Sequence, residues 1–377
     1  MSFEDVEREM EAAAGRHVFP GAVLLVREGT RVFYLRAFGN RSLEPAVTPM
    51  GEDTIFDVSS LTKPFATTIA IMLLAREGKV RLDDRVTRFF HNFGVLGKTH
   101  ITFRHLLSHC SGLAAWRPFY KEILQVERHG GRIKFLGSRG AKEHVYQAIH
   151  KERLDAPPGT RTQYSDLGFI LLGAVVEAIS GMTLDRFCHE RIFRPLALRS
   201  TAFIDLSLLR TRRLEPVTEM IAPTERCPWR KKILCGEVHD DNAYAMGGVA
   251  GHAGLFASAK DLDVILCCLK ACYHNHTADA LIPQHIVQEF WTPDQTVAGS
   301  TWCLGWDTPS PVNSSSGEHF SRHSVGHLGF TGTSVWLDLE RDRHVILLSN
   351  RVHPSRDNEQ IRAFRPHIHD LIAKALQ

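Results

Sequence analysis

The sequence predicts an α/β protein of the α+β kind, with a central antiparallel sheet built from both ends of the chain and flanked by helices. β-rich runs lie near both termini, while the middle of the chain is mainly helical in pattern. A chain of 377 residues is too long for one small domain and fits two lobes, or one lobe with a large insertion. We therefore expect residues 1–78 and 296–377 to form an α/β sheet domain and residues 79–295 to form an inserted helical domain.

The N-terminal part combines a helix with the first strands. Glu4–Gly15 has the spacing of an amphipathic helix. Gly21–Glu28 and Thr30–Phe38 are rich in β-branched, aliphatic and aromatic side chains and are joined at Gly29, which indicates two paired strands. A further β-rich run, Thr54–Val58, follows before the first long helical pattern.

Helical patterns dominate the middle of the chain, and strands return near its end. Thr102 is expected to cap a helix that begins directly after it. The other expected helices are Leu61–Arg76, Lys142–Arg153, Ser165–Ile179, Leu184–Phe193 and Asp261–Tyr273. Thr333–Leu339 and Arg343–Ser349 are β-rich, and a closing helix spans about Asn358–Leu376.

Composition excludes several classes of function. The 45 basic and 42 acidic residues give a net charge of +3 without long runs of one sign, so no nucleic-acid partner is expected. Apolar stretches are too short to predict a membrane span. The first residues lack the basic and apolar parts of a signal peptide, which predicts a cytoplasmic protein, or a periplasmic or secreted one if the chain is a mature form. Eight cysteines fall short of disulfide-framework density and are expected to be reduced.

A candidate nucleophile stands where the run Thr54–Val58 turns into the helix Leu61–Arg76. Ser60 lies at the start of this helix and Lys63 follows three positions later, on the same face. A hydroxyl beside an amine makes a nucleophile with a base, and the helix N-terminus adds N–H groups that stabilise an oxyanion. Taken alone, the tetrapeptide is better explained by Ser60 as a helix cap.

Tyr164 is a second candidate, because it follows a turn-rich segment and directly precedes the helix Ser165–Ile179. A tyrosine in this position can be held rigidly at a boundary between lobes. Its reference pKa of about 10 makes it a poor base, unless a nearby lysine ammonium favours the phenolate. Taken alone, Tyr164 is explained as a packed aromatic residue with a solvated hydroxyl.

The third candidate is the glycine-rich stretch Gly326–Thr333, which contains His327 and enters a strand. Three glycines suit a backbone that must approach a ligand closely. An edge strand here can supply an oxyanion N–H and strand-like contacts to an acyl group. A β-bulge with an incidental histidine explains the same residues at least as well.

The three candidates together resemble a known set of motifs. These are Ser60-x-x-Lys63, Tyr164-Ser165-Asp166 and His327-Leu328-Gly329, in that order. They resemble the three motifs of the serine β-lactamase and penicillin-binding fold, closest to its class C branch, with the family VIII esterases and D-alanyl-D-alanine carboxypeptidases. Flanking stretches at Ile101–Leu113, Gly251–Phe256 and Leu304–Trp306 are also similar to this branch, and the resemblance extends from about Val18 to the last helix.

The resemblance implies a β-lactamase/transpeptidase-like fold with the active site between the sheet domain and the inserted domain. Ser60 would attack an acyl carbon, and Lys63 and Tyr164 would take its proton and later deliver one to the leaving group. The backbone N–H groups of Ser60 and Phe330 would form the oxyanion hole, and water would hydrolyse the acyl-enzyme. Neither a metal nor an organic cofactor is implied. The expected partner is a small acyl compound (an ester, an amide or a cell-wall peptide), and the oligomeric state stays open.

Two departures from the family motifs bear on the substrate. Asp166 replaces the usual Asn, and a carboxylate accepts hydrogen bonds but cannot donate them unless protonated. Leu328 replaces a hydroxyl residue that would help to bind a substrate carboxylate, and His327 is only partly charged near neutrality. Both changes weaken the case for efficient β-lactam hydrolysis and favour an esterase-like enzyme. The resemblance adds Gly329, His252 and Trp306 as substrate-binding residues, although His252 is equally well explained as a loop histidine bonded to backbone.

Other functions stay open beside the esterase-like one. The same fold would serve a β-lactamase, a D-Ala-D-Ala carboxypeptidase or a muropeptide amidase, and a catalytically silent relative that binds or self-assembles is the non-enzyme alternative. A metal site is suggested only by a cluster formed by Cys267, Cys268, Cys272, His274 and His276. Because the second ligand pair of a typical zinc site is missing, we expect buried helix cysteines there and no metal.

Overall fold

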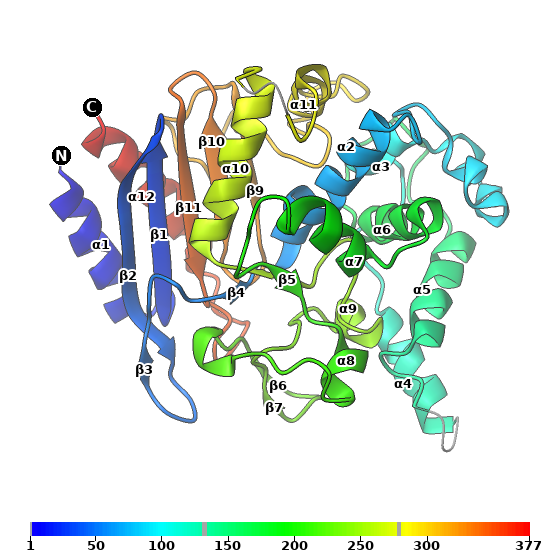
Figure 1. The fold of residues 1–377 in the computed structure, drawn as a ribbon, viewed down its shortest axis with the longest axis horizontal. Coiled ribbons are helices and arrows are strands. Elements are labelled where there is room, and N and C mark those ends of the chain that lie inside the picture. Colours follow the sequence, from blue (N-terminus) through cyan, green and yellow to red (C-terminus); the bar gives the residue numbers. More distant parts are fainter. Residues whose placement is uncertain (1, 130–133, 277–279) are drawn as a thin grey trace.

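A six-stranded antiparallel sheet drawn from both chain ends forms one side of the protein (Figure 1). The computed structural model describes residues 2–129, 134–276 and 280–377. The strand order is β3-β2-β1-β11-β10-β9. The strands are β1 (Gly21–Glu28), β2 (Arg31–Ser42), β3 (Thr48–Pro49), β9 (Ser324–Leu328), β10 (Ser334–Asp338) and β11 (Arg343–Ser349). The predicted sheet from both termini is therefore confirmed.

The register between the first and last strands fixes the two faces of this sheet. Strands β1 and β11 pair from Ala22 opposite Ser349 to Glu28 opposite Arg343. Val23 and Leu25 point into the larger core, while Leu24 points into a second core on the other face. Both faces are buried, which explains the continuous apolar run of β1. Each such side chain contributes about 1.5–3 kcal/mol on burial.

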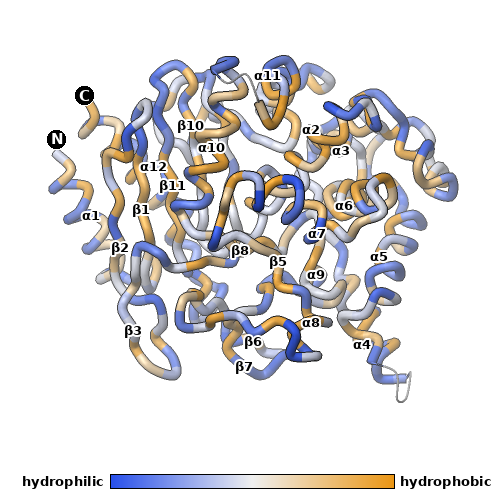
Figure 2. Tube along the Cα trace, viewed as in Figure 1, coloured by the Kyte–Doolittle hydropathy of each residue, from blue (hydrophilic) through white to orange (hydrophobic). Residues whose placement is uncertain are grey.

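Helices cover both faces of the sheet. Helix α1 (Phe3–Gly15) packs against α12 (Ile361–Ala375) on one face, where Met10 and Ile368 belong to the second core. Helix α10 (Ala259–Tyr273) lies against β1 and β11 on the other face, where Leu262 joins the larger core. Figure 2 shows hydrophobic segments along these strands and helices. Helix α10 falls within the range assigned to the inserted domain, and the division after residues 78 and 295 stays a prediction.

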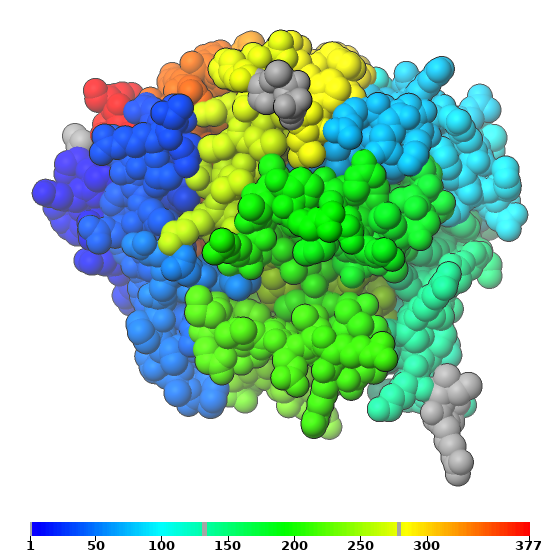
Figure 3. Space-filling model, in the orientation of Figure 1, coloured from blue at the N-terminus to red at the C-terminus, as the bar shows by residue number. Residues whose placement is uncertain are grey.

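The remaining helices and short strands lie beside the sheet, and Figure 3 shows the N-terminal strands and the cyan-to-green middle segments on opposite sides of one view. The helices are α2 (Ile69–Arg76), α3 (Phe103–Leu107), α4 (Phe119–His129), α5 (Arg139–Lys151), α6 (Asp166–Ser180), α7 (Leu184–Cys188), α8 (Leu206–Arg210), α9 (Asp241–Ala245) and α11 (Gln284–Phe290). The short strands are β4 (Phe56–Asp57), β5 (Ala202–Phe203), β6 (Arg226–Cys227), β7 (Lys232–Ile233) and β8 (Leu255–Ala257).

Local capping signals place the helix starts well. Thr102 accepts a hydrogen bond from the backbone of His105 at the start of α3, and Ser165 accepts one from Gly168 at the start of α6. The prediction of one continuous α-helix over Leu61–Arg76 is wrong for the first half of this range. There a 3₁₀ turn, Ser59–Leu61, is followed by a wider π-helical turn, Lys63–Thr68, before α2 begins. Pro64, which lacks an N–H donor, stands in the first turn of the π segment.

None of the helices in the described ranges is long and apolar enough by itself to cross a membrane. A pair formed by Asp166–Ser180 and Leu184–Phe193 meets the length and composition criteria only when taken together, with a bend of 73° between its halves.

Candidate active site

Ser60 lies at a cavity of about 660 Å³. Tyr164, Asp166, His252 and Phe330 also line this cavity. His327, Leu328 and Gly329 contribute a further part of the lining. The structure thus brings together segments that lie up to 270 positions apart in the sequence, including two of the three residues expected to be catalytic. The third, Lys63, is fully buried beneath the cavity.

The backbone that presents Ser60 is held by Asp57. Ser59 has a φ of +51°, which is an unusual conformation for a residue other than glycine. Its backbone N–H donates to Asp57 Oδ1 at 2.8 Å, and the backbone N–H of His239 donates to Asp57 Oδ2 at 2.6 Å. Burial raises the pKa of Asp57, although these donors oppose the rise. One buried carboxyl group therefore joins the strained turn before Ser60 to the loop that contains His239.

Lys63 makes three polar contacts, and all three involve residues of the expected site. Its Nζ lies 3.3 Å from Ser60 Oγ, 2.7 Å from Asp166 Oδ1 and 3.0 Å from the backbone oxygen of His252. The ammonium also lies 4.7 Å from the centre of the Tyr164 ring. Lys63 is thus close to both Ser60 and Tyr164, as the motif spacing suggested. Asp166, which we expected to bind substrate, lines the cavity and also forms an ion pair with Lys63.

The ion pair changes the proton affinity of the site. Burial alone lowers the pKa of Lys63, but the Asp166 carboxylate and the neighbouring Tyr164 together outweigh burial, and the net pKa is raised. Burial raises the pKa of Tyr164, and Asp166 adds to this rise while Lys63 opposes it. Lys63 therefore lowers the pKa of Tyr164, as we expected, but burial and Asp166 raise this pKa by more. In the unliganded protein Lys63 is therefore an ammonium and Tyr164 a neutral phenol.

Replacing Asp166 by asparagine is expected to move the pH dependence of hydrolysis. If neutral Lys63 accepts the proton of Ser60, kcat/KM rises with pH through the pKa of Lys63. Asp166→Asn removes the charge that raises this pKa, so the rising limb should move to lower pH by about 1–3 units, the range for a close opposite charge. The measurement is kcat/KM from pH 5 to 10 for both proteins. If kcat/KM rises over the same pH range in both proteins, the rise does not report the deprotonation of Lys63 or Tyr164.

Neighbouring residues hold Tyr164 in place. The backbone N–H of Ser165 donates to His109 Nδ1 at 3.1 Å, and the rings of His109 and Tyr164 are 4.6 Å apart. Trp302 packs against both of these rings. Among the described residues the Tyr164 hydroxyl makes no hydrogen bond, although Ser60 and Lys63 lie close enough to lower its pKa.

The glycine-rich stretch forms the end of β9 and the turn after it. A side chain at Gly329 would lie 2.6 Å from the backbone oxygen of Val58, so only glycine allows this turn to approach the Ser60 segment. The backbone N–H of Phe330 donates to Ser59 Oγ at 3.2 Å. This N–H thus faces the residue beside Ser60. An oxyanion at Ser60 would have to replace Ser59 Oγ as its acceptor.

His327 is buried and uncharged. Burial, followed by the charge of Lys63, lowers the pKa of its imidazole to about 3, although a contact of 2.8 Å between Nδ1 and the backbone oxygen of Leu328 opposes the shift. We expected partial charge near neutrality; the structure gives a neutral ring instead. His327 therefore offers no cation to a substrate carboxylate.

His252 also belongs to the cavity wall, and it is linked to both Lys63 and Asp240. Its backbone oxygen accepts from Lys63, and its Nε2 lies 3.0 Å from Asp240 Oδ1. Burial favours the neutral form of Asp240, but His252 outweighs burial and the pKa of Asp240 is lowered. His252 is thus more than a loop histidine bonded to backbone.

Trp306 does not reach the cavity. Its side chain is fully buried and packs against Phe65 and Trp291 in the core. This placement argues against the substrate contact that the sequence suggested for Trp306. Trp302, four positions earlier, lines the cavity in its place, because Gly305 turns the chain with a φ of +80° between the two tryptophans.

Several cavity residues were not expected from the sequence. They are Ser59, Trp116, His239, Asp240, Asp241, Ala253, Trp302, Asp307, Arg351, Arg356, Ile361, Arg362 and Arg365. Asp307 is notable because burial raises the pKa of its carboxyl to about 6, against donors from Thr301 and Thr308. The adjacent acidic residues at 240–241 and the closely spaced arginines at 351–365 are visible in the sequence. No local sequence pattern, however, predicts that they lie near Ser60.

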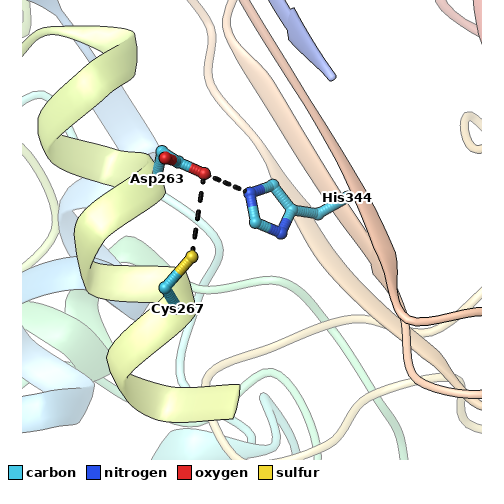
Figure 4. A group of neighbouring side chains, drawn as sticks. All are labelled: Asp263, Cys267 and His344. Carbon is cyan, nitrogen blue, oxygen red and sulfur yellow. Dashed lines mark hydrogen bonds and ion pairs between the residues drawn. The ribbon is translucent and has the colours of Figure 1, made fainter. Parts of the chain in front are cut away.

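The suggested cysteine and histidine cluster does not converge on one point. In the described ranges the one group of three or more possible metal-binding side chains is Asp263, Cys267 and His344 (Figure 4). The carboxylate of Asp263 already accepts two hydrogen bonds from Arg27, at 2.7 and 2.6 Å, and lies 2.7 Å from His344 Nε2. A guanidinium in this position opposes a bound cation. We therefore interpret the group as an ion-pair network that fastens α10 to the sheet.

Known proteins resemble this chain over nearly its whole length. The model of the Beta-lactamase family matches residues 4–367. N-acetylmuramyl-L-alanine amidase from Bacillus subtilis (strain 168) is 32% identical over 375 residues, covering 93% of this chain and 81% of the relative.

Solved structures agree on the fold. Simvastatin synthase from Aspergillus terreus gives a TM-score of 0.72 at 19% identity, covering 100% of this chain and 98% of that one. The octameric penicillin-binding protein homologue from Pyrococcus abyssi gives 0.69 at 22% identity, covering 97% and 77%. The predicted β-lactamase/transpeptidase-like fold is confirmed. Since the family model spans almost every residue and the fold agrees with it, the chain belongs to the Beta-lactamase family and is a serine hydrolase.

Proposed function

We propose that this protein cleaves small acyl compounds, with a preference for esters, through an acyl intermediate on Ser60. The observation that supports it most directly is the contact of 3.3 Å between Lys63 Nζ and Ser60 Oγ at the floor of the cavity. A hydroxyl and an amine at this separation, beside the Tyr164 ring, form an activated nucleophile. The order of the motifs supports a position nearest the class C branch of the family as part of this proposal.

The proposed reaction has two stages. Lys63, in its neutral form, takes the proton of Ser60 while the serine oxygen attacks the acyl carbon, and the hydroxyl of Tyr164 relays a proton from Lys63 to the leaving alcohol. The oxyanion binds the backbone N–H groups of Ser60 and Phe330, with Phe330 giving up its bond to Ser59 Oγ. Water then attacks the acyl-enzyme with the same groups acting in reverse, releasing the acid and free Ser60.

The residues around Ser60 support a preference for esters over β-lactams. Leu328 has no hydroxyl for the β-lactam carboxylate, and the His327 ring beside it is neutral. Asp166 is engaged by Lys63 and is a carboxylate, so it cannot donate to a side-chain amide. An ester with a good leaving group needs little more than Ser60 and the oxyanion hole.

The test compares p-nitrophenyl butyrate with nitrocefin. We expect the ester to have the higher kcat/KM, because one unpaired polar partner costs about 1–3 kcal/mol, or about 5- to 150-fold. Leu328→Thr should raise nitrocefin turnover relative to ester turnover, and it is cleaner than a change at Asp166, which also disturbs Lys63. Faster hydrolysis of nitrocefin by the unmodified enzyme would contradict the preference for esters.

An amidase is the second candidate, and the 32% identity to N-acetylmuramyl-L-alanine amidase favours it. Amide hydrolysis needs a general acid that protonates the leaving nitrogen. The neutral phenol of Tyr164 and the ammonium of Lys63 are suited to this step. A panel of N-acyl amino acids and muropeptides, run beside the esters, decides between the two.

The cytoplasm remains the proposed compartment. All eight cysteines are free thiols, which fits a reducing environment. Fractionation of cells that produce the native protein would test this.

A further inference from the structure

His239 is buried at the cavity that contains Ser60, yet the acyl transfer proposed above gives it no role. The residue is 4% exposed, and it belongs to the lining of the cavity. It lies in the loop before α9 and contacts both segments that are expected to supply the oxyanion hole. Its backbone meets the turn before Ser60, and its ring meets Phe330. These two contacts point to a role in holding the oxyanion hole together.

The backbone of His239 is tied through Asp57 to the turn that presents the nucleophile. The N–H of His239 donates to Asp57 Oδ2 at 2.6 Å, and the other carboxylate oxygen accepts from the N–H of Ser59 at 2.8 Å. Asp57 also bonds to the residue after Phe330, because its backbone oxygen accepts from Thr331 Oγ1 at 2.7 Å. One buried residue therefore joins the nucleophile turn, the His239 loop and the turn after β9.

The ring of His239 lies on the ring of Phe330. The two ring centres are 5.6 Å apart and the planes are 25° from parallel, which is a stacked arrangement. The imidazole is itself held in place, because its Nε2 lies 2.8 Å from Glu225 Oε2, and Arg356 Nε donates to the same buried oxygen at 2.6 Å. Arg351 also contacts Phe330, with its guanidinium 4.5 Å from the ring centre. The stacked imidazole thus restricts where Phe330 can lie.

Phe330 needs this support because little else fixes its side chain. It is 47% exposed, and it stands between Gly329 and Gly332 in a turn where the backbone is conformationally free. Its N–H donates to Ser59 Oγ in the unliganded protein and has to reach an oxyanion during the reaction. Such a donor must lie about 2.7–3.1 Å from the oxyanion, and a displacement of about 1 Å can cost about 100-fold in rate.

We propose that His239 and Asp57 are positioning residues that hold the two oxyanion donors, the N–H groups of Ser60 and Phe330, at the separation that the transition state requires. Asp57 fixes the turn that presents Ser60, and His239 fixes Phe330 by stacking on its ring. Because the N–H of His239 is bonded to Asp57, one connected unit sets both donors. The inference rests on the proposed function and adds two residues to the support of its oxyanion hole.

The first experiment compares His239→Ala with His239→Phe. Both variants keep the backbone N–H that binds Asp57, and in both of them Glu225 keeps Arg356 as a partner. Alanine removes the ring that stacks on Phe330, whereas phenylalanine supplies another flat ring. We expect His239→Ala to lower kcat/KM for p-nitrophenyl butyrate by about 10- to 100-fold, as for a misplaced donor, and His239→Phe to recover most of this loss. Equal losses in the two variants would refute the stacking role.

A second substrate separates positioning from a general loss of structure. p-Nitrophenyl thionobutyrate carries sulfur in place of the carbonyl oxygen, and sulfur is a weak hydrogen-bond acceptor. The ratio of kcat/KM for the ester to that for the thionoester, each divided by its uncatalysed rate, therefore measures the oxyanion hole. A smaller fraction of folded enzyme lowers both rates together and leaves this ratio unchanged. We expect the ratio to fall by about 10-fold in His239→Ala and by less than about 2-fold in His239→Phe.

His344→Phe is the matched control. His344 is also a buried histidine whose Nε2 lies close to a carboxylate oxygen, at 2.7 Å from Asp263 Oδ1, but it lies outside the lining of the cavity. This variant should have a lower melting temperature and the same ratio of ester to thionoester as the unmodified enzyme. An equal fall of the ratio in His344→Phe and His239→Ala would show that the effect of His239 is only structural.

Asp57→Asn tests the other half of the unit. The amide keeps one acceptor oxygen but turns its NH2 group toward the N–H of either Ser59 or His239, so one of the two bonds is lost. In the folded variant the ratio of ester to thionoester should fall at least as far as in His239→Ala. An unchanged ratio in folded Asp57→Asn would contradict the role of Asp57. If its melting temperature shows that the variant does not fold, the two His239 variants decide.

A boronic acid keeps the proposal testable without turnover. The oxygen of Ser60 adds to the boron of 1-butaneboronic acid while its proton passes to solvent, and a boron-bound oxygen of the tetrahedral anion occupies the oxyanion hole. The compound should raise the melting temperature of the unmodified protein, raise that of His239→Ala less, and leave that of Ser60→Ala unchanged. If no ester is hydrolysed, the proposed function fails and this measurement decides the positioning role alone. That role is overturned if the boronic acid stabilises the unmodified protein and His239→Ala equally, or stabilises neither.

Discussion

The Ser60→Ala protein is expected to lose ester hydrolysis by about a million-fold, the scale on which a serine hydrolase loses turnover without its nucleophile. Ser60 Oγ is the one serine hydroxyl that Lys63 Nζ contacts among the described residues, so we expect no neighbouring serine to form the acyl bond in its place. Alanine removes a single oxygen, and the fold should persist. The measurements are p-nitrophenyl butyrate hydrolysis and covalent labelling by a fluorophosphonate probe, with the adduct located by mass spectrometry.

Ser59 is the matched control for this experiment, because it stands beside Ser60 and also lines the cavity. Ser59→Gly suits the φ of +51° at this position, since glycine adopts positive φ without strain. The probe should still label Ser60 in this variant. An adduct on Ser59 in the unmodified protein, or full labelling of Ser60→Ala, would show that the nucleophile has been assigned to the wrong serine.

Lys63→Ala is expected to lower the acylation rate by about 100- to 10,000-fold, the usual contribution of general-base assistance. The amine contacts both the nucleophile and Asp166, and its charge also opposes the rise in the pKa of Tyr164. Its loss therefore removes the base and leaves Tyr164 a weaker acid. Single-turnover labelling by the fluorophosphonate probe measures the acylation step directly.

The variant also leaves the carboxylate of Asp166 without its buried partner, so loss of stability could imitate loss of catalysis. The double variant Lys63→Ala with Asp166→Asn removes both charges and separates the two effects. Stability should return in the double variant, as judged by its melting temperature, while activity should stay low. A near-normal acylation rate in the double variant would contradict the assignment of Lys63 as the base. Lys260→Ala, which removes an exposed lysine paired with Asp53, controls for the general loss of a surface charge.

The catalytic residues illustrate how far local patterns extend. The order of the three motifs and the small-residue turn before Ser60 are properties of the sequence, and they predicted which side chains share the cavity. The roles of these side chains as nucleophile, base and acid remain predictions that the variants above test. The partner of Asp166 could not be predicted, because its ion pair joins residues 103 positions apart and depends on how α6 packs against the Ser60 turn.

The two tryptophans near the third motif also show that a local sequence pattern does not predict tertiary contacts. Trp302 and Trp306 stand four positions apart, and both are large and apolar, so neither composition nor spacing distinguishes them. The tertiary structure buries Trp306 between Phe65 and Trp291 and turns Trp302 toward the cavity. A turn at Gly305 decides which face each ring meets, and this turn is fixed by contacts with the rest of the fold.

The sequence by itself determined the fold class, the sheet from both termini and the motif residues that meet at Ser60. These follow from local causes: the apolar runs of β1 and β11, the caps Thr102 and Ser165, and the fixed spacing of Ser60 and Lys63. Only the tertiary structure decided the charge states of Lys63 and His327 and the location of Arg351, Arg362 and Arg365 at the cavity. A pKa depends on burial and on neighbouring charges in space, and an ion pair depends on which distant segments pack together, so neither is encoded in a local pattern.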